Sequence, residues 1–255
     1  MRAKIKSFSY KFLPAFFILL FIIIWQYVSN VGVLPNFMLP SPKDVALAFW
    51  GDLPNLIKNT TTTLKEAILG LLISIFVAFI ISFFMDRFEL INRTIYPILI
   101  LTQTVPAVAI APLLVLWFGY GIISKIILVA IVCFFPITIG LLEGLKSIDC
   151  DNINLLKSMG ATKFQIFKLV KLPSSLGSFF GGLKIAVSYS VVGAVIAEWL
   201  GGYDGLGVYM IRVKKSYSFD KMFAVIFLIS VISLIMIKSV DIIKHKIMKW
   251  EYNSK

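Results

Sequence analysis

The amino-acid sequence predicts an all-α polytopic membrane protein with six transmembrane helices. Of its 255 residues, 59% are hydrophobic and 15% are charged, and the mean hydropathy is +0.91. A single soluble core could not bury so much apolar surface, so the bilayer must be the solvent for most of the chain. The apolar residues are also gathered in runs of about 20, the length that crosses the hydrocarbon layer.

The net charge of +12 does not indicate a nucleic-acid-binding protein. The basic residues flank the apolar runs, where membrane lipid headgroups and topology account for them, and no basic patch is interleaved with aromatic residues. The two cysteines, Cys133 in an apolar run and Cys150 in a polar loop, differ too much in predicted depth for a disulfide. We therefore expect contact with lipid, no nucleic acid, and no bridge.

Residues 1–63 are expected to form an N-terminal transmembrane helix and an outer loop. The apolar run from Phe12 to Val31 is longer than that of a secretory signal and should be retained as the first crossing. From Gly32 to Thr63 the chain is punctuated by prolines, and a short interfacial helix is expected from Pro42 to Trp50.

Residues 64–243 are expected to form the core of five further helices, followed by a basic tail at 244–255. In the first of them, Leu64 to Met85, small residues recur every four positions and would let a neighbouring helix approach closely, although chance spacing is the alternative. This small-residue row consists of Gly70, Ser74, Ala78 and Ser82. The later crossings are expected at 95–117, 122–142, 183–200 and 222–243, with a hinge or short helix at 174–182 and a tight outer turn at Gly119 and Gly121.

The crossing at 95–117 contains Pro106 and Pro112, which should kink it. A carbonyl freed by such a kink is tolerated in the membrane only where protein or a wet cavity covers it. Polar Gln103 and Thr104 lie just before Pro106. We therefore expect this helix to face the interior of the bundle.

Two residues of the crossing at 183–200 are candidates for contact with a ligand. Glu198 ends a row of small residues, Gly182, Ala186, Ser190 and Ala194, which should turn it toward protein. It is either a gate or ligand contact near the outer end, or an interfacial carboxylate paired with Arg212 or Lys214. Tyr189, with Gln103 and Trp117, could stack on and hydrogen-bond a flat ligand, and the alternative is plain packing.

No constellation for covalent chemistry is expected. Gly140, Gly144, Lys146 and Ser147 do not have the spacing of a phosphate loop, and the single histidine, His245, lies in the tail. We expect no catalytic residue, cofactor or metal in this chain. The distribution of positive charge, with 17 of the 25 Lys and Arg on one side, predicts that both termini and the loop at 143–175 are cytoplasmic, although the cluster from Arg212 to Lys215 opposes this.

The polar stretch from Asp149 to Pro173 interrupts two apolar segments. Asp149 or Asp151 could cap a short helix that Gly160 ends, and a second amphipathic segment from Lys163 to Lys171 would be closed by Leu172-Pro173. Both segments could lie on lipid or dock a partner.

This stretch resembles the cytoplasmic loop motif of binding-protein-dependent ABC importer permeases. Gly160, nine further residues, Val170, Lys171 and Leu172-Pro173 match the motif, whereas Asn154, Leu155 and Leu156 stand where the family has Glu-Ala-Ala. The likeness extends over about residues 60–243. VPAVAIAPLLVLWFGYG (105–121) and GAVIAEWLGGYDGLGVYM (193–210) resemble permeases for nitrate, sulfonates, taurine and pyrimidine precursors of thiamine, and AVSYSVVGAVIAEWLG (186–201) is most similar to the last of these.

The resemblance implies a type I ABC importer permease in the plasma membrane of a prokaryote. It implies a second permease copy, most simply an identical one, an extracytoplasmic solute-binding protein, and a separate ABC ATPase that holds the ATP and Mg, so that this chain is not an enzyme. The implied solute is a thiamine pyrimidine precursor resembling hydroxymethylpyrimidine, with nitrate, sulfonate or taurine as the alternative. A transporter without a motor is disfavoured, because neither an inverted repeat nor a second intramembrane charge pair is evident.

Two sets of residues are assigned roles, the first by this resemblance and the second by the kink, the polar residues and the small-residue row described above. The ATPase-coupling loop would use Asn154, Leu155, Leu156, Met159, Gly160, Ala161, Val170, Leu172 and Pro173. The translocation pathway candidates are Gln103, Thr104, Pro106, Tyr189 and Glu198.

Overall fold

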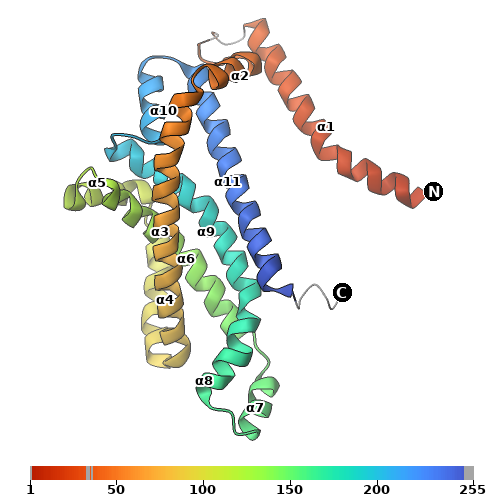
Figure 1. The fold of residues 1–255 in the computed structure, drawn as a ribbon, viewed down its shortest axis with the longest axis vertical. Helices are drawn as coiled ribbons and strands as arrows, with labels where there is room; N and C mark the ends of the chain where they lie inside the picture. Colours follow the sequence, from red (N-terminus) through yellow and green to blue (C-terminus); the bar gives the residue numbers. More distant parts are fainter. Residues whose placement is uncertain (1, 33–34, 36, 250–255) are drawn as a thin grey trace. The chain divides into compact units, whose positions relative to one another are not determined.

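The computed structural model describes residues 2–32, 35 and 37–249, and every regular element among them is helical (Figure 1). The elements are α1 (Arg2–Val31), α2 (Pro42–Gly51), α3 (Leu53–Arg87), α4 (Glu89–Thr104), α5 (Ala107–Phe118), α6 (Ile122–Lys146), α7 (Cys150–Ser158), α8 (Lys163–Ile166), the π-helical turn η1 (Phe167–Lys171), α9 (Leu172–Gly201), α10 (Leu206–Lys215) and α11 (Phe219–Ile247). Within this described part, five helices are long and apolar enough to cross a membrane, and α4 with α5 makes a sixth span if the bent pair is counted as one.

Contacts among the described residues divide the chain into two compact units, residues 1–58 with 209–228, and residues 59–208 with 229–255. The predicted division at residues 63 and 243 stays a prediction. In the first unit, α2 begins with a reciprocal capping box between Ser41 and Asp44, which confirms the short helix expected at 42–50. Trp25 donates from Nε1 to the carbonyl oxygen of Pro40 at 3.1 Å, which ties α1 to the start of α2.

Asp52, at the junction of α2 and α3, joins three parts of the first unit. Its carboxylate accepts hydrogen bonds from the Tyr209 hydroxyl and the Asn55 amide, and it lies 3.2 Å from the Lys221 ammonium. Partial burial raises the pKa of this carboxyl group, but these three partners favour the charged form more strongly, so that its pKa lies below the usual value. The charged form of Asp52 therefore stabilises this unit.

The second unit is built on the contact between α6 and α9, which pack along most of their lengths (Figure 1). Glycine makes the contact close, because Gly140, Gly144 and Gly182 each face backbone atoms of the opposite helix. The thiol of Cys133 donates to the carbonyl oxygen of Ala186 at 3.2 Å across the same contact. The predicted row that ends in Glu198 lies on this buried side of α9, as expected.

The small-residue row of α3 faces α6, which confirms the close approach that its spacing predicts. A side chain at Gly70 would overlap Val129. Ser74 donates to the carbonyl oxygen of Ala130, and Ser82 donates to that of Thr138 at 3.4 Å. The four-residue spacing is therefore a packing signal.

Three predicted element boundaries were wrong. Helix α3 begins at Leu53 and not at Leu64, because Pro54 falls in its first turn, where a missing N–H is tolerated. The kink expected at Pro106 is a complete break, with α4 and α5 bent by 98° around Val105 and Pro106. The hinge or short helix expected at 174–182 is part of the continuous helix α9, and of its three glycines Gly182 packs closely against α6.

Candidate functional site

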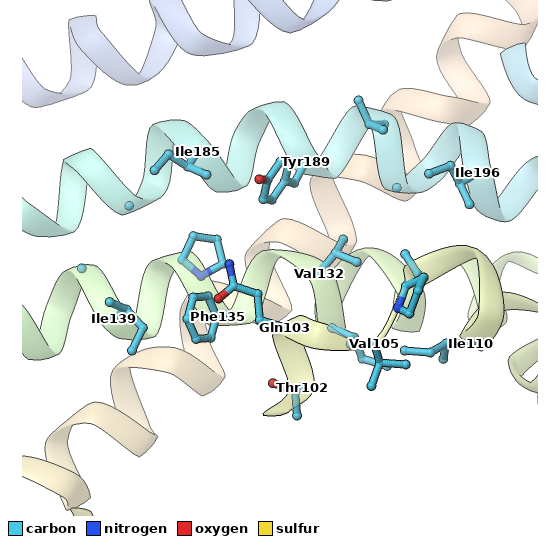
Figure 2. Close-up of a pocket in the computed structure, with 18 of the residues that line it drawn as sticks. Thr102, Gln103, Val105, Ile110, Val132, Phe135, Ile139, Ile185, Tyr189 and Ile196 are labelled. Carbon is cyan, nitrogen blue, oxygen red and sulfur yellow. The ribbon is translucent and has the colours of Figure 1, made fainter. Parts of the chain in front are cut away.

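A cavity of about 780 Å³ lies in the second unit between the α4–α5 break, α6 and α9 (Figure 2). Gln103 and Tyr189 enter this space from different helices, and Val132, Phe135 and Ile139 of α6 form one wall. The break at Pro106 opens this space, because α5 turns away from the direction of α4 instead of filling it. The break between α4 and α5 thus leaves a cavity beside the packed pair α6 and α9.

The lining of the cavity is mostly apolar with a few neutral polar groups. Thr102, Gln103, Ser178 and Tyr189 offer hydroxyl and amide groups, and Glu143 is the one acidic or basic residue among the described residues that line it. Apolar walls with a few polar groups are typical of sites for small organic ligands. Since a buried anion needs a compensating charge, this lining suits an uncharged solute better than an anionic one.

The structure brings together three of the five pathway candidates. Gln103, Pro106 and Tyr189 line the cavity. The Thr104 hydroxyl instead donates to the carbonyl oxygen of Leu101 at 2.8 Å at the exposed end of α4. Glu198 lies elsewhere, in a buried polar cluster.

The Glu198 carboxylate is buried, with 1% of the residue exposed, and its partners are local. The Thr63 hydroxyl donates to Oε1 at 2.7 Å, and the backbone N–H of Gly207 donates to Oε2. Thr63 Oγ1 also accepts from the N–H of Leu206 at 2.9 Å, and Asn59 accepts from that of Gly205 at 2.9 Å. These bonds hold the turn at 202–207 against α3 and α9, an arrangement that accounts for Glu198 without a ligand.

Sequence reasoning missed a buried ion pair beside this cluster. Lys125 of α6 lies 3.0 Å from the Glu66 carboxylate of α3, and both side chains are almost fully buried. Glu66 is four residues before Gly70 and so extends the small-residue row by one step, which is the signal that could have revealed it. Lys184 and Asp241 form another ion pair between α9 and α11. The expectation that a second intramembrane charge pair is lacking was therefore wrong.

The loop between α6 and α9 forms two short helices beyond the ends of those helices (Figure 1). Asp149 is the residue that caps α7, by accepting from the N–H of Asp151 at 3.0 Å. Gly160 adopts a φ of +80°, and the N–H of Ala161 returns to the carbonyl oxygen of Leu156 at 3.0 Å, so the glycine ends the helix as predicted. A capping box between Thr162 and Gln165 then starts α8.

Large apolar side chains on this loop are exposed, although the segment is polar overall. Leu155 is 62% exposed, Met159 74% and Phe164 67%. Among the other predicted coupling residues, Asn154 and Gly160 are exposed, and Leu156, Ala161, Val170, Leu172 and Pro173 are half-buried. Large apolar side chains exposed on a projecting loop indicate a surface that a partner covers.

Leu172-Pro173 does not close the second segment, contrary to expectation. The chain passes from α8 through η1 directly into α9, and the N–H of Leu172 donates to the carbonyl oxygen of Phe167, five residues earlier. Pro173 has no N–H for an α-helical bond to Leu169, and its ring crowds that carbonyl group. The π turn, which is wider than an α-helical turn, accommodates Pro173 without ending the helix.

The described residues contain no group of three or more His, Cys, Asp or Glu side chains that could hold a metal ion. Membrane-spanning helices, a bundle cavity at a helix break and a projecting loop with exposed apolar side chains define a membrane transport subunit. The chain belongs to the family of binding-protein-dependent transport system inner membrane components, whose model matches residues 70–249.

Curated relatives and solved structures agree with this assignment. The chain is 35% identical over 233 residues to a probable ABC transporter permease protein of Haemophilus influenzae, covering 91% of this chain and 95% of the relative. It is also 35% identical over 245 residues to the formylaminopyrimidine transport permease protein ThiX of Halalkalibacterium halodurans, covering 93% and 95%. A subunit of the inward-facing MetNI methionine ABC transporter matches with a TM-score of 0.69 at 18% identity, over 77% of this chain and 97% of that one. The predicted fold of a type I ABC importer permease is confirmed.

Proposed function

We propose that this chain is the membrane-spanning permease subunit of an ATP-driven importer and that the loop at 149–173 is its docking site for a cytoplasmic ATPase. The observation that carries the proposal is the exposure of three large apolar side chains, Leu155, Met159 and Phe164, held outside the helical core on two capped helices. An amphipathic helix with such side chains fits a hydrophobic groove of a partner. Family membership supplies the class of partner.

The working complex contains three kinds of protein, and this chain is present in two copies. ATP and Mg belong to the ATPase, an extracytoplasmic binding protein delivers solute, and a second copy of this chain encloses the pathway. Both termini and the loop are cytoplasmic, as the excess of Lys and Arg on that side favours. ATP binding brings the two loops together and turns the cavity outward, because ATP binds the two conformations with different affinities.

Replacing Gly160 with valine is expected to lower recovery of the ATPase with the tagged permease by about tenfold or more. A φ of +80° costs L-residues roughly 1–2 kcal/mol and a β-branched residue more, so the turn that presents α7 and α8 would change. No heavy atom outside the local chain lies within 4 Å of an added Cβ, so overlap does not contribute. Co-purification from membranes measures the effect, and recovery of a cytosolic ATPase through this loop would also place the loop in the cytosol.

Gly160→Asn is the matched control, because asparagine tolerates the left-handed conformation. It should retain most of the ATPase, and both variants should insert into the membrane in wild-type amounts. Full ATPase recovery with Gly160→Val would contradict the docking assignment.

The proposed solute is a small uncharged pyrimidine precursor of thiamine. Two observations support it, namely the neutral polar lining by Gln103 and Tyr189 and the 35% identity to a formylaminopyrimidine transport permease. Proteoliposomes that contain this chain, its ATPase and its binding protein should accumulate labelled formylaminopyrimidine and not taurine when ATP is supplied. Uptake of taurine, a sulfonate or nitrate would assign the alternative solute class, and uptake by the permease alone without ATP would assign a motor-independent transporter.

A further inference from the structure

We propose that Lys171 and Asp86 form a mechanical joint through which the docking loop moves α3 as well as α9. This inference rests on the proposed function and adds a second route for the movement of the loop. The loop continues covalently into α9. The ion pair is what connects it to the inner end of α3, a helix 85 residues earlier in the chain.

The geometry of the pair is that of a specific contact. The Lys171 ammonium lies 2.7 Å from Oδ1 and 2.9 Å from Oδ2 of Asp86, so one cation serves both carboxylate oxygens. The side chains are 22% and 17% exposed, which places the pair largely out of water and limits its screening by salt. Charge-assisted bonds of this kind fix orientation as well as distance.

An aromatic contact joins the same two segments one turn away. The rings of Phe83 on α3 and Phe167 at the start of η1 are 5.1 Å apart and nearly perpendicular, the edge-to-face arrangement that aromatic rings prefer. Two independent contacts of different chemistry therefore hold η1 against α3. A joint of two contacts transmits rotation as well as displacement.

The π turn gives this joint its position in the helix. Pro173 favours the π turn, in which each hydrogen bond spans five residues instead of four. The wider turn changes the direction in which the Lys171 side chain projects from the helix. Such turns often occur at functional points of helices. Lys171 is the last residue of the turn, at the point where the loop becomes a transmembrane helix.

Helix α3 carries the movement to the other side of the membrane. On the N-terminal side of Asp86, the small-residue row of α3 packs on α6. Nearer the start of α3, Asn59 and Thr63 bind the turn at 202–207. The stretch from residue 59 to residue 86 spans about 40 Å at 1.5 Å per residue. A shift of the loop on ATP binding would thus reach the outer turn through α3, as well as through α9.

Charge reversal tests the joint in the full importer reconstituted with its ATPase and binding protein. Lys171→Asp and Asp86→Lys should each lower solute uptake per ATP hydrolysed by about tenfold, within the usual range of coupling between sites. Asp86 lies on α3, outside the docking loop, so Asp86→Lys should do so with ATPase recovery unchanged. The double reversal K171D/D86K should return uptake per ATP to within about threefold of wild type, because the pair reforms with opposite polarity. Lys171→Gln and Asp86→Asn remove the charges with little change in volume and serve as the variants if a reversal prevents insertion.

The exposed pair Glu89 and Arg93 is the matched control. Its atoms are 2.9 Å apart, but it lies within one turn of α4 and joins no two elements. Reversal of either residue should leave uptake per ATP within about twofold, as expected of an exposed pair. Wild-type coupling in Lys171→Asp and Lys171→Gln, or a double reversal as impaired as the single ones, would overturn the joint while leaving the proposed function intact. Failure of the wild-type chain to retain the ATPase would overturn both.

Discussion

Gly182→Ala is expected to lower the melting temperature of the purified protein by roughly 10 °C, corresponding to about 3 kcal/mol of overpacking in a chain of this size. An added Cβ at this position would overlap the carbonyl oxygen of Pro136 and lie 3.4 Å from the Cα of Gly140. Both are backbone atoms of α6, so no side chain can turn aside to make room. The methyl group must push α6 and α9 apart, and this is the most extensive helix contact in its unit.

Gly181→Ala is the control for that measurement. The residue is adjacent in the same helix, but no heavy atom outside the local helix lies within 4 Å of its added Cβ. Alanine should therefore leave the melting temperature unchanged or raise it slightly through its helix propensity. Thermal unfolding in detergent, followed by tryptophan fluorescence, compares the two variants. Equal losses from both would show that the close approach of α6 and α9 does not determine stability.

The contact at Gly182 also shows which features a sequence can reveal. Four-residue rows of small residues predicted the buried faces of α3 and α9, because helical periodicity and the steric need for small residues are both local. Whether Gly181 and Gly182 form a hinge or a packing contact depends on what lies opposite. That information is in Pro136, 46 residues earlier, and no local pattern contains it.

The same distinction between local patterns and contacts of distant residues applies to the candidate site. The loop could be placed from its polarity, its capping residues and Gly160, and the pathway helix from Pro106, since each signal is local. The pairs between Glu66 and Lys125, and between Asp86 and Lys171, join positions 59 and 85 residues apart. Their formation requires a particular packing of α3 against the rest of its unit. Glu66 and Asp86 continue the small-residue row of α3 by one four-residue step at each end. The predicted row ran only from Gly70 to Ser82, so it did not include these two acidic residues.

Glu198→Ala is expected to destabilise the protein by about 4 kcal/mol. The substitution would leave the Gly207 N–H without its buried acceptor, at a cost of about 1–3 kcal/mol, and would open a cavity beside Gly205. The Thr63 hydroxyl would keep only its longer bond to the carbonyl oxygen of Asn59, at 3.2 Å. Glu198→Gln, which keeps the volume and one acceptor oxygen, should lose about half as much. The exposed Glu89→Ala should change stability by less than about 0.5 kcal/mol.

The same set of variants decides whether Glu198 holds the turn at 202–207, as its partners in the structure indicate, or serves as the gate or ligand contact that the sequence suggests. If the residue holds the turn at 202–207, the loss of stability and the loss of uptake should follow the same order, with alanine below glutamine and glutamine below wild type. Limited proteolysis should then cut first in that turn, because its backbone N–H groups at Gly205, Leu206 and Gly207 are fixed by Asn59, Thr63 and Glu198. If Glu198→Ala melts at the wild-type temperature and uptake is still abolished, the carboxylate acts on the solute or on the opening of the pathway, and the structural role is wrong.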